Sequence, residues 1–263
     1  MCVCPRRQTE AMRITYLGHA SVLIELDGLK VITDPLLRPR ILGALRRVAP
    51  PAAAEHLAGT DLILLSHAHH DHLDTGSLRM IEGEPPVLGP APALRLARSV
   101  GLTGEALDVG SSSRHGAVTI EAVHADHDGR RMPWSRDAQA LGFVLRGPSG
   151  SVYFAGDTGV YEEMSDLGTV DAALLPVAGW GPRLPAGHMG PGEAADAVAR
   201  IEPRLAIPIH WGSYERVGMR SGGARDEPAR RFCDQVGERS PGVRAVLLEP
   251  GATVEVEPEG SSA

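Results

Sequence analysis

The chain contains few cysteines and no long apolar run. Its three cysteines, Cys2, Cys4 and Cys233, are too few for a disulfide framework. No apolar run approaches the roughly 20 residues that span a bilayer, and no apolar stretch follows Arg6 and Arg7, which argues against a secretory signal. These absences predict a cytoplasmic protein without a transmembrane segment.

An excess of basic charge is also missing. The 263 residues carry a formal net charge of −7, whereas a general nucleic-acid-binding surface needs a basic face. We therefore expect no nucleic-acid partner, although a local basic pocket is not excluded. The length suffices for one large α/β domain, and the hydrophobic share of 43% is ordinary for a globular protein.

Histidine, in contrast, is abundant. Most of the eleven histidines stand beside Asp or Gly at the ends of apolar runs. Imidazole and carboxylate are the usual ligands of zinc and its first-row neighbours. Cys2 and Cys4 could also bind a metal. Because their spacing is short and the sequence has no second cysteine pair, we interpret them as part of a loose tail.

The first half of the chain has the pattern of short strands. Apolar runs separated by Gly-His and Asp-Gly pairs predict a meander over 13–17, 20–26 and 30–33. A stretch rich in proline and arginine, 35–51, predicts a loop or flap. A short buried strand is expected at 61–65.

Helices and strands alternate along the rest of the chain. We expect helices over 77–82, 92–100 and 191–201 and strands over 118–123, 141–145, 152–155, 172–177, 205–209 and 243–248. Two similar strand-rich halves with interleaved helices predict two packed sheets with helices outside. No linker divides the chain, so we expect a single domain over 12–250 between tails at 1–11 and 251–263. Met12 is an alternative start, because regular structure begins immediately after it.

The strongest chemical signal follows the predicted strand 61–65. It is the run Ser66-His67-Ala68-His69-His70-Asp71-His72. A sharp turn after the strand would place His67 and His69 on one side of the loop, and Asp71 and His72 could then reach a second ion. The alternative is a solvated polar loop rich in histidine. Four ligand-type residues that follow a buried strand argue against it.

Ligand-type residues also directly follow other predicted strands, namely His124, His127, Asp157 and His210. Each of them alone could be a capping Asp, a buried core His or a loop His. Four strand ends that deliver one ligand set form a joint pattern that these separate interpretations do not predict. The sequence therefore indicates a metal site at the ends of four strands.

Together these motifs resemble the metallo-β-lactamase superfamily, with its HxHxDH loop, a later His, a Gly-Asp-Thr-Gly turn and a late His after a strand. Residues 12–34, 187–194 and 207–212 are similar to its lactonase and phospholipase-D-like branch, which includes L-ascorbate-6-phosphate lactonase and N-acylphosphatidylethanolamine-hydrolysing phospholipase D. The resemblance runs from Met12 to about Glu249. It implies an α/β fold, a four-layer αββα sandwich of the metallo-β-lactamase type.

The resemblance also implies a role for each matching residue. One ion would bind His67, His69 and His127, the other Asp71, His72 and His210, and Asp157 would bridge them. Asp71 and Asp157 would also serve catalysis, the first by orienting the nucleophile and the second by fixing the separation of the ions. His188, which precedes the predicted helix at 191–201, would face the substrate or support the ligands.

Two histidines leave the assignment open. His127 matches the branch better than His124, but His124 stands where the branch has proline, so either could be the ligand. His19 resembles a family position near the site. We leave it off the ligand list as a structural residue.

This ligand set predicts a dinuclear-metal-dependent hydrolase. Two divalent ions about 4 Å apart would lower the pKa of a bridging water towards neutrality, and the resulting hydroxide would cleave a phosphodiester or a lactone/ester-type bond. We expect zinc, although manganese or iron also suits an imidazole–carboxylate site. The alternatives are a non-hydrolytic di-iron redox protein and a metal-binding member of the same fold without catalysis.

The substrate prediction depends on Arg130, Arg131 and Trp134, which follow His127. Arginine forks match phosphate geometry, which favours a phosphorylated small molecule or a phospholipid-like substrate. A solvated loop whose arginines offset nearby acidic residues is the competing interpretation. The sequence leaves a homo-oligomer open.

Overall fold

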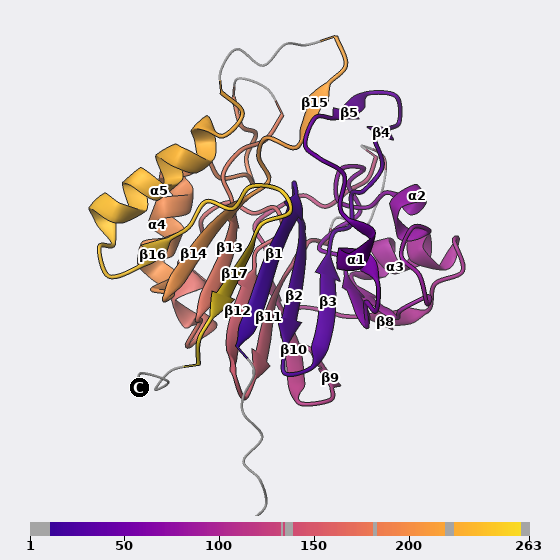
Figure 1. Cartoon of the computed structure of the whole chain (residues 1–263), viewed down its shortest axis with the longest axis horizontal. Coiled ribbons are helices and arrows are strands. Elements are labelled where there is room, and N and C mark those ends of the chain that lie inside the picture. The colour runs from indigo at the N-terminus through magenta and orange to yellow at the C-terminus, as the bar shows by residue number, and fades with distance from the viewer. Residues whose placement is uncertain (1–10, 133, 135–138, 181–182, 219–223, 259–263) are drawn as a thin grey trace, which may run out of the picture.

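The computed structural model describes residues 11–132, 134, 139–180, 183–218 and 224–258. Two seven-stranded sheets pack against each other, and helices cover the outer face of each (Figure 1). This is the predicted α/β fold, the four-layer αββα sandwich.

The first sheet combines the beginning and the end of the described chain. Its strand order is β17 (Thr253–Val256), β1 (Met12–Gly18), β2 (Ser21–Leu26), β3 (Leu29–Thr33), β6 (Leu62–Leu64), β7 (Val87–Gly89) and β8 (Gly104–Ala106). The outer face of this sheet is covered by α1 (Ala54–Leu57), α2 (Thr75–Leu78) and α3 (Ala91–Arg98).

The second sheet comes from the later part of the chain. Its order is β16 (Arg244–Ala245), β14 (Leu205–Ile209), β13 (Ala172–Pro176), β12 (Gly150–Phe154), β11 (Leu141–Gly147), β10 (Val118–His124) and β9 (Ser112–His115). On its side of the sandwich lie η1 (Glu162–Leu167), α4 (Pro191–Ile201) and α5 (Glu227–Arg239).

A third, small sheet lies beside the sandwich. Its order is β15 (Tyr214–Arg216), β5 (Leu45–Arg47) and β4 (Arg40–Ile41). Figure 1 shows it above the ends of the large sheets. Two of these strands fall within the stretch 35–51, where the sequence predicted only a loop or flap. We call β15, β5 and β4 the small sheet.

Strands β6 and β7 of the first sheet bury both faces. In β6, Leu62 and Leu64 face the second sheet, whereas Ile63 belongs to the core under α2 and α3. Successive side chains of a strand point to opposite faces, so a strand buried on both sides is continuously apolar. This explains why the sequence shows apolar runs rather than clean alternation.

Most predicted strands and helices are present with small shifts at their ends. The helix expected at 77–82 is α2, and the strand expected at 243–248 is reduced to β16. Helix α5 was not anticipated. Its Phe232 and Val236 are buried although its mean composition is strongly polar.

The predicted C-terminal tail at 251–263 is wrong for residues 253–256. These residues form β17, which pairs antiparallel with β1, as in the pair Ile14 and Val254. Val254 and Val256 are buried, while Thr253 and Glu255 are exposed. Strand β17 pairs with the edge of β1 and buries two valines. Its alternation of polar and apolar residues covers only four positions, which is too short to predict a strand from the sequence.

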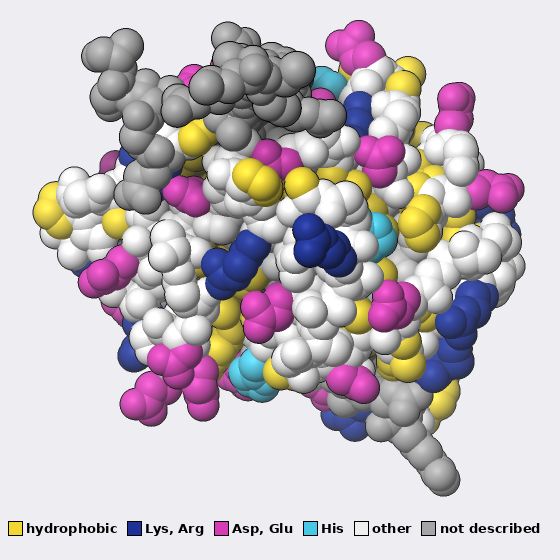
Figure 2. Space-filling view, turned by 90° about the horizontal axis from the view of Figure 1, so that it is seen from below, with side chains coloured by type: hydrophobic (Ala, Val, Ile, Leu, Met, Phe, Trp, Pro, Cys, Tyr) yellow, Lys and Arg dark blue, Asp and Glu magenta, His cyan; other side chains and the backbone are white. Residues whose placement is uncertain are grey.

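Acidic and basic side chains are not segregated on the face of the molecule that Figure 2 shows. Figure 2 shows acidic and basic side chains intermingled there, without a broad basic patch. Within the described residues, no helix is both long and apolar enough to cross a membrane.

The directions of the strands bring the predicted ligand loops to one edge. Strands β3 and β6 run parallel, as do β12, β13 and β14. Strand β10 is antiparallel to β11, which is antiparallel to β12, so β10 and β12 point the same way. The segments that leave the ends of β6, β10, β12 and β14 therefore meet at the same end of the sandwich.

Candidate metal centre

The loop with the HxHxDH motif is shaped by its own backbone. It leaves β6, and the amides of His72 and Leu73 both bond the carbonyl of His69, at 3.2 and 2.8 Å. This turn lets one short loop contribute His67 and His69 to one group of side chains and Asp71 and His72 to another. The two groups adjoin, because the ring centroids of His67 and His72 are 4.2 Å apart.

The first group contains His67, His69 and His127, whose ligand atoms all lie within 4.8 Å of one another. His127 Nε2 is 3.2 Å from His69 Nδ1. The Nδ1 of His127 donates to the carbonyl of Gly187 at 2.8 Å. Because a carbonyl only accepts, this bond leaves Nε2 as the lone-pair nitrogen that faces the group.

Gly187 has to be glycine for this contact. Its φ is +79°, and a Cβ there would lie 2.8 Å from the carbonyl oxygen of Asp126 and 3.1 Å from the Cα of His127. A side chain would therefore push the carbonyl of Gly187 away from His127.

The structure brings His127, and not His124, to this group. His124 is the exposed last residue of β10, and its ring lies edge-on to Tyr161 with 4.9 Å between centroids. It lines a separate recess of about 470 Å³ that none of the predicted ligands lines.

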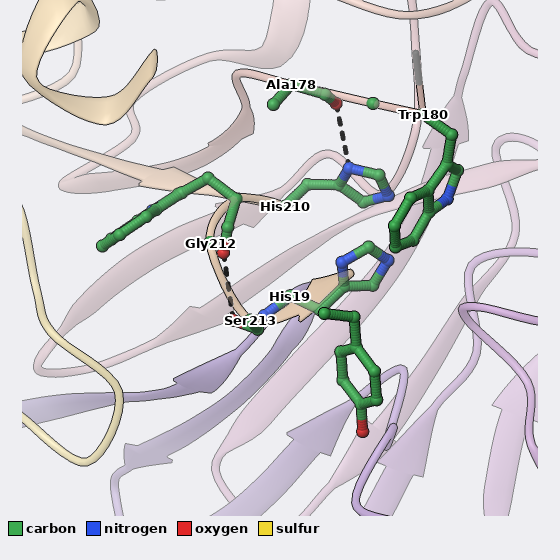
Figure 3. Close-up of a pocket in the computed structure, with 9 residues that line it drawn as sticks. His19, Ala178, Trp180, His210, Gly212 and Ser213 are labelled. Carbon is green, nitrogen blue, oxygen red and sulfur yellow. Dashed lines mark hydrogen bonds between the residues drawn. The ribbon is translucent and has the colours of Figure 1, made fainter. Parts of the chain in front are cut away.

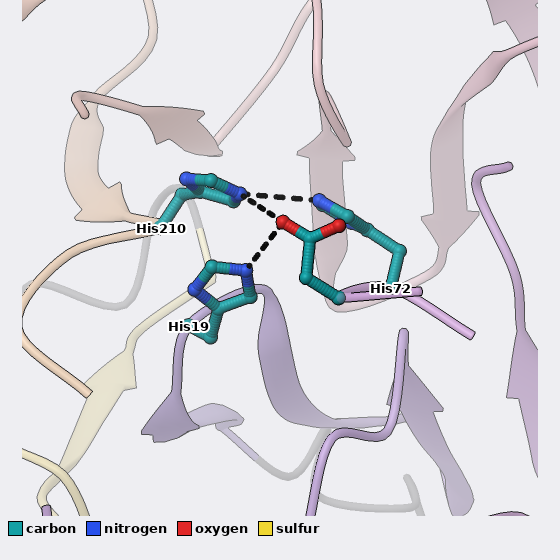
Figure 4. Close-up of side chains that lie close together, drawn as sticks. His19, His72 and His210 are labelled. Atoms are coloured by element: carbon teal, nitrogen blue, oxygen red, sulfur yellow. Dashed lines mark hydrogen bonds and ion pairs between the residues drawn. The ribbon is translucent and has the colours of Figure 1, made fainter. Parts of the chain in front are cut away.

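The second group contains Asp71, His72 and His210 together with His19, again with ligand atoms within 4.8 Å (Figure 4). His210 Nε2 is 3.1 Å from His72 Nε2 and 3.7 Å from Asp71 Oδ2. The Nδ1 of His210 donates to the carbonyl of Ala178 at 2.9 Å, so its lone pair also faces inward.

His19 belongs to the site, contrary to its exclusion from the predicted ligand list. Its Nε2 lies 3.3 Å from Asp71 Oδ2, and its ring centroid is 3.9 Å from that of His210. His19 directly follows β1, so the rule applied to the other strand ends would have found it.

Asp157 lies between the two groups. Its Oδ2 is 3.1 Å from His72 Nε2, and its Oδ1 is 3.4 Å from His210 Nε2. Asp157 also forms a cluster with His127 and His188, and His188 Nε2 is 3.4 Å from its Oδ2. The bridging role of Asp157 and a role of His188 in facing the substrate or supporting the ligands stay predictions.

Asp34 is a buried residue that the sequence analysis missed. It accepts hydrogen bonds from the backbone N–H of Ser66 at 2.7 Å, from the Ser66 hydroxyl, and from His72 Nδ1 at 2.7 Å. Such a carboxylate fixes the orientation of a metal-binding imidazole. Asp34 directly follows β3, and this position is again the signal that could have revealed it.

Most of the imidazoles are neutral. Burial lowers the pKa of His67 well below its ordinary value and lowers that of His19 to about 3. Burial also lowers the pKa of His127 to about 4, although Asp157 opposes the shift. Neutral imidazole is the form that binds a metal ion.

The pKa values of Asp71 and Asp157 are lowered, whereas burial raises that of Asp34. Burial would raise the pKa of Asp71, but hydrogen bonds with His19 and His210 outweigh it and hold the pKa well below the usual range.

The pKa of His72 is shifted in the opposite direction to that of His67, His19 and His127. Burial would lower the pKa of His72, but Asp157 and Asp34 raise it well above the usual value, so a cation bound at Nε2 would have to displace a proton.

The buried polar atoms at the centre without a hydrogen-bond partner among the described residues include His67 Nε2 and Asp157 Oδ1. An unpartnered buried polar atom costs about 1–3 kcal/mol. A divalent cation would satisfy both atoms, and histidine with aspartate is a donor set that zinc and related metals accept. The residues therefore fit metal ions.

Three residues of the centre hold strained backbone conformations. His19, Asp34 and His210 have φ values of +59°, +33° and +64°. Such conformations cost of the order of 1–3 kcal/mol each in non-glycine residues and tend to occur at functional sites. All three directly follow the ends of strands.

The predicted substrate residues have other partners. Arg131 donates to the carbonyls of Ala68 and Leu73 at 2.7 and 3.0 Å, so it braces the HxHxDH loop. Arg130 pairs with exposed Asp128, and the Trp134 side chain is 76% exposed. A role in substrate binding stays a prediction for all three. Cys2 and Cys4 lie outside the described residues.

A small cavity of about 60 Å³ adjoins the second group (Figure 3). Its walls include His19, Trp180, His210 and Tyr214. The space is polar and large enough for water molecules. It therefore gives the second group an opening to small ligands.

A two-sheet sandwich with clustered histidines and aspartates at one end defines a metallo-hydrolase fold. Residues 30–211 match the family model described as the β-lactamase superfamily domain. The chain therefore belongs to the metallo-β-lactamase superfamily of metal-dependent hydrolases.

Individual relatives agree with this family. A metal-dependent hydrolase of Methanopyrus kandleri is 32% identical over 93% of this chain and 100% of its own length. An N-acyl-phosphatidylethanolamine-hydrolyzing phospholipase D of Caenorhabditis elegans is 32% identical over 76% of this chain and 64% of its own length. The metallo-hydrolase Igni18 of Ignicoccus hospitalis superposes with a TM-score of 0.72 at 22% identity, over 94% of this chain and 99% of its own.

Proposed function

We propose that the protein is a hydrolase that uses two divalent metal ions. The observation that carries the proposal is the position of Asp157, which contacts His72 and His210 of one group and clusters with His127 of the other. We assign one ion to His67, His69 and His127, the other to Asp71, His72 and His210, and Asp157 to both. His19 contacts Asp71 and His210 and would lie beside the second ion.

When bound, the ions supply Lewis acidity and lower the pKa of a coordinated water. The protein's own contribution is orientation. The carbonyls of Gly187 and Ala178 hold the rings of His127 and His210, and Asp34 holds the ring of His72. Side chains fixed in this way keep the geometry of the site without reorganising during the reaction.

His188 is suited to proton transfer. Burial would lower its pKa, but the hydrogen bond with Asp157 outweighs it and raises the pKa above the usual value. Its side chain is 16% exposed, so a substrate can reach it. We infer that His188 faces the substrate beside Asp157, within reach of a proton transfer.

The substrate is proposed from the relatives and the charge of the loops. The Caenorhabditis elegans relative hydrolyses a phospholipid by its name, which favours a phosphodiester over a lactone or another ester. We therefore propose a phosphorylated small molecule or a phospholipid-like substrate, hydrolysed in the cytoplasm, with zinc as the first choice of metal and manganese or iron as alternatives.

The test begins with metal content, measured by plasma mass spectrometry on the purified protein. Hydrolysis of bis-p-nitrophenyl phosphate and of a lactone panel is then followed before and after chelation. We expect about two equivalents of zinc or manganese and activity that chelation abolishes. Two irons without hydrolysis would favour a redox protein, and the absence of bound metal would overturn the ligand assignment.

A matched pair of variants separates ligands from neighbours. His69 belongs to the first group, whereas His70 beside it belongs to none of the candidate groups. We expect His69→Ala to lose metal and activity and His70→Ala to keep both. Equal losses would indicate that the loop, and not the ligand set, was damaged.

The phosphate hypothesis has its own test. Arg130→Ala should raise KM for phosphorylated substrates and leave KM for neutral lactones unchanged, because an arginine fork recognises phosphate. An unchanged KM for both classes would remove the support that this loop gives to a phosphorylated substrate.

A further inference from the structure

Trp180 makes a direct contact with the second group of ligands. Its indole N–H donates to Asp71 Oδ2 at 2.6 Å. The same oxygen is 3.3 Å from His19 Nε2. A hydrogen bond to a charged carboxylate is stronger than one between neutral groups, so the indole fixes the rotamer of Asp71.

The other side of Trp180 packs on the small sheet. Its ring joins the cluster of Leu36, Ile41, Tyr214 and Leu45. The last three of these side chains come from β4, β15 and β5 in turn, so every strand of the small sheet contributes. The guanidinium of Arg216 on β15 lies 5.9 Å from the centre of the indole.

Trp180 therefore spans two parts of the protein. One edge of the indole touches a carboxylate of the metal centre, and its face touches the apolar side chains of the small sheet. In Figure 3 the indole lies beside the rings of His19 and His210 at the cavity. Its ring centroid is 5.5 Å from that of His19.

We propose that Trp180 is a positioning residue that holds Asp71 for the second metal ion and couples the affinity of that ion to the packing of the small sheet. This inference rests on the proposed function. The first group, His67, His69 and His127, has no contact with Trp180 among the interactions of the described residues. The effect of Trp180 is therefore confined to the second ion.

Trp211 provides a matched comparison. It is also an indole near the centre, but it is buried, it stacks on Tyr16 at 5.5 Å, and its N–H donates to the carbonyl of Pro208 at 2.9 Å. Trp211→Phe therefore removes an indole hydrogen bond that does not end on a ligand, whereas Trp180→Phe removes one that does.

The experiment titrates metal-free protein with zinc against a chromophoric chelator. Loss of a hydrogen bond to a ligand typically costs 10–100-fold in metal affinity. We expect Trp180→Phe to weaken the second zinc equivalent by at least about tenfold and to leave the first unchanged. Trp211→Phe should lower thermal stability without changing the ratio of the two affinities.

Tryptophan fluorescence gives a second measurement. In the wild type, we expect a change in emission at the second equivalent of zinc, because the partner of the Trp180 indole becomes a metal ligand. Trp180→Phe should abolish that change. A change that appears with the first equivalent, or that persists in Trp180→Phe, would contradict the assignment.

A third variant acts from a distance. Ile41 is buried in the cluster under the small sheet and does not contact Asp71. Ile41→Ala should loosen the packing of Trp180 and weaken only the second equivalent. If the wild type binds two zinc ions and all these variants bind them equally well, the inference is wrong while the proposed function stands. If the wild type binds fewer than two, the proposed function fails first.

Discussion

The two halves of the metal centre are built in different ways. The first group takes His67 and His69 from one loop and adds His127, whose orientation comes from a backbone carbonyl. The second group is held by side chains from distant segments, with Asp34 behind His72 and Trp180 beside Asp71. Both halves take two ligands from the same loop and one from a distant segment, but in the second half side chains outside the loop also hold the two loop ligands.

This difference has a practical meaning. A ligand that is placed by its own loop tolerates changes elsewhere in the protein. A ligand that is oriented by a remote side chain changes its position when that side chain moves or is replaced. We therefore expect the second group to be the sensitive half of the centre, and the following experiments test that expectation.

The largest effect on hydrolysis is expected for His127, the one ligand of the first group that lies outside the HxHxDH loop. His127→Ala should reduce hydrolysis by at least about 100-fold, more than the loss of an outer partner costs. The control is His124→Ala, which removes an exposed imidazole three residues earlier and should stay near wild-type rates. Steady-state kinetics measure both. A large loss in His124→Ala would show that the wrong histidine was assigned.

The next largest effect is expected at Asp34. Asp34→Asn keeps the shape of the side chain but removes the charge that orients His72, so the second metal equivalent should bind about 10–100-fold more weakly. Asp171 is a matched control, because it is buried and accepts from the N–H and hydroxyl of Ser151. Asp171→Asn should affect stability alone. Equal losses at both metal equivalents in Asp34→Asn would contradict the division into halves.

Metal removal should lower the thermal stability. At a free metal concentration of 100 times Kd, one site adds about 2.7 kcal/mol, which corresponds to a shift in Tm on the order of 5–10 °C for a domain of this size. Calorimetry with and without chelator measures the shift. It should be smaller in Asp34→Asn, and an identical shift there would mean that this carboxylate does not serve the second ion.

The smallest effect is expected for Asp74, which follows the HxHxDH loop, and it concerns the free energy of unfolding. Asp74 accepts from the N–H of Ser77 at the start of α2 and pairs with Arg38. Asp74→Ala should cost about 1–2 kcal/mol of unfolding free energy, as other caps do. Asp128→Ala, which breaks the exposed pair with Arg130, is the control and should cost less than about 1 kcal/mol.

The effect of Asp74 should also depend on pH. Burial would raise the pKa of Asp74, but the hydrogen bonds from Arg38 and Ser77 hold it below the ordinary value. A carboxyl with a depressed folded pKa stabilises the protein above its unfolded pKa of about 3.9 and loses that contribution as the pH falls through the folded value. Urea unfolding at pH 7 and pH 3 should show the difference between wild type and Asp74→Ala shrinking in acid.

The same division explains what the sequence could predict. The HxHxDH loop and the ligand-type residues after β10, β12 and β14 are visible because spacing and strand ends are local properties of the chain. Asp34 and His19 follow strands too, but each stands alone without a motif. The bond from Trp180 to Asp71 joins residues 109 positions apart, and no local pattern indicates such a pair.

The fold shows a similar limit. The apolar runs predicted most strands of both sheets, because burial on two faces leaves a strong signal, but β7, β8 and β9 were not predicted. Helix α5 and strand β17 were missed. One is polar on most of its surface, and the other is four residues long. Their places depend on neighbours far away in the sequence.

The pairing of β17 with β1 also sets an order of events during synthesis. Strand β1 is made well before its neighbour β17, because the paired residues Thr15 and Thr253 are 238 positions apart. At about 5–20 residues per second, a ribosome leaves β1 without that neighbour for about ten seconds or more. An uncovered strand edge invites pairing with other chains. During its synthesis the chain therefore passes through an interval in which the edge of β1 is open to pairing with neighbouring chains.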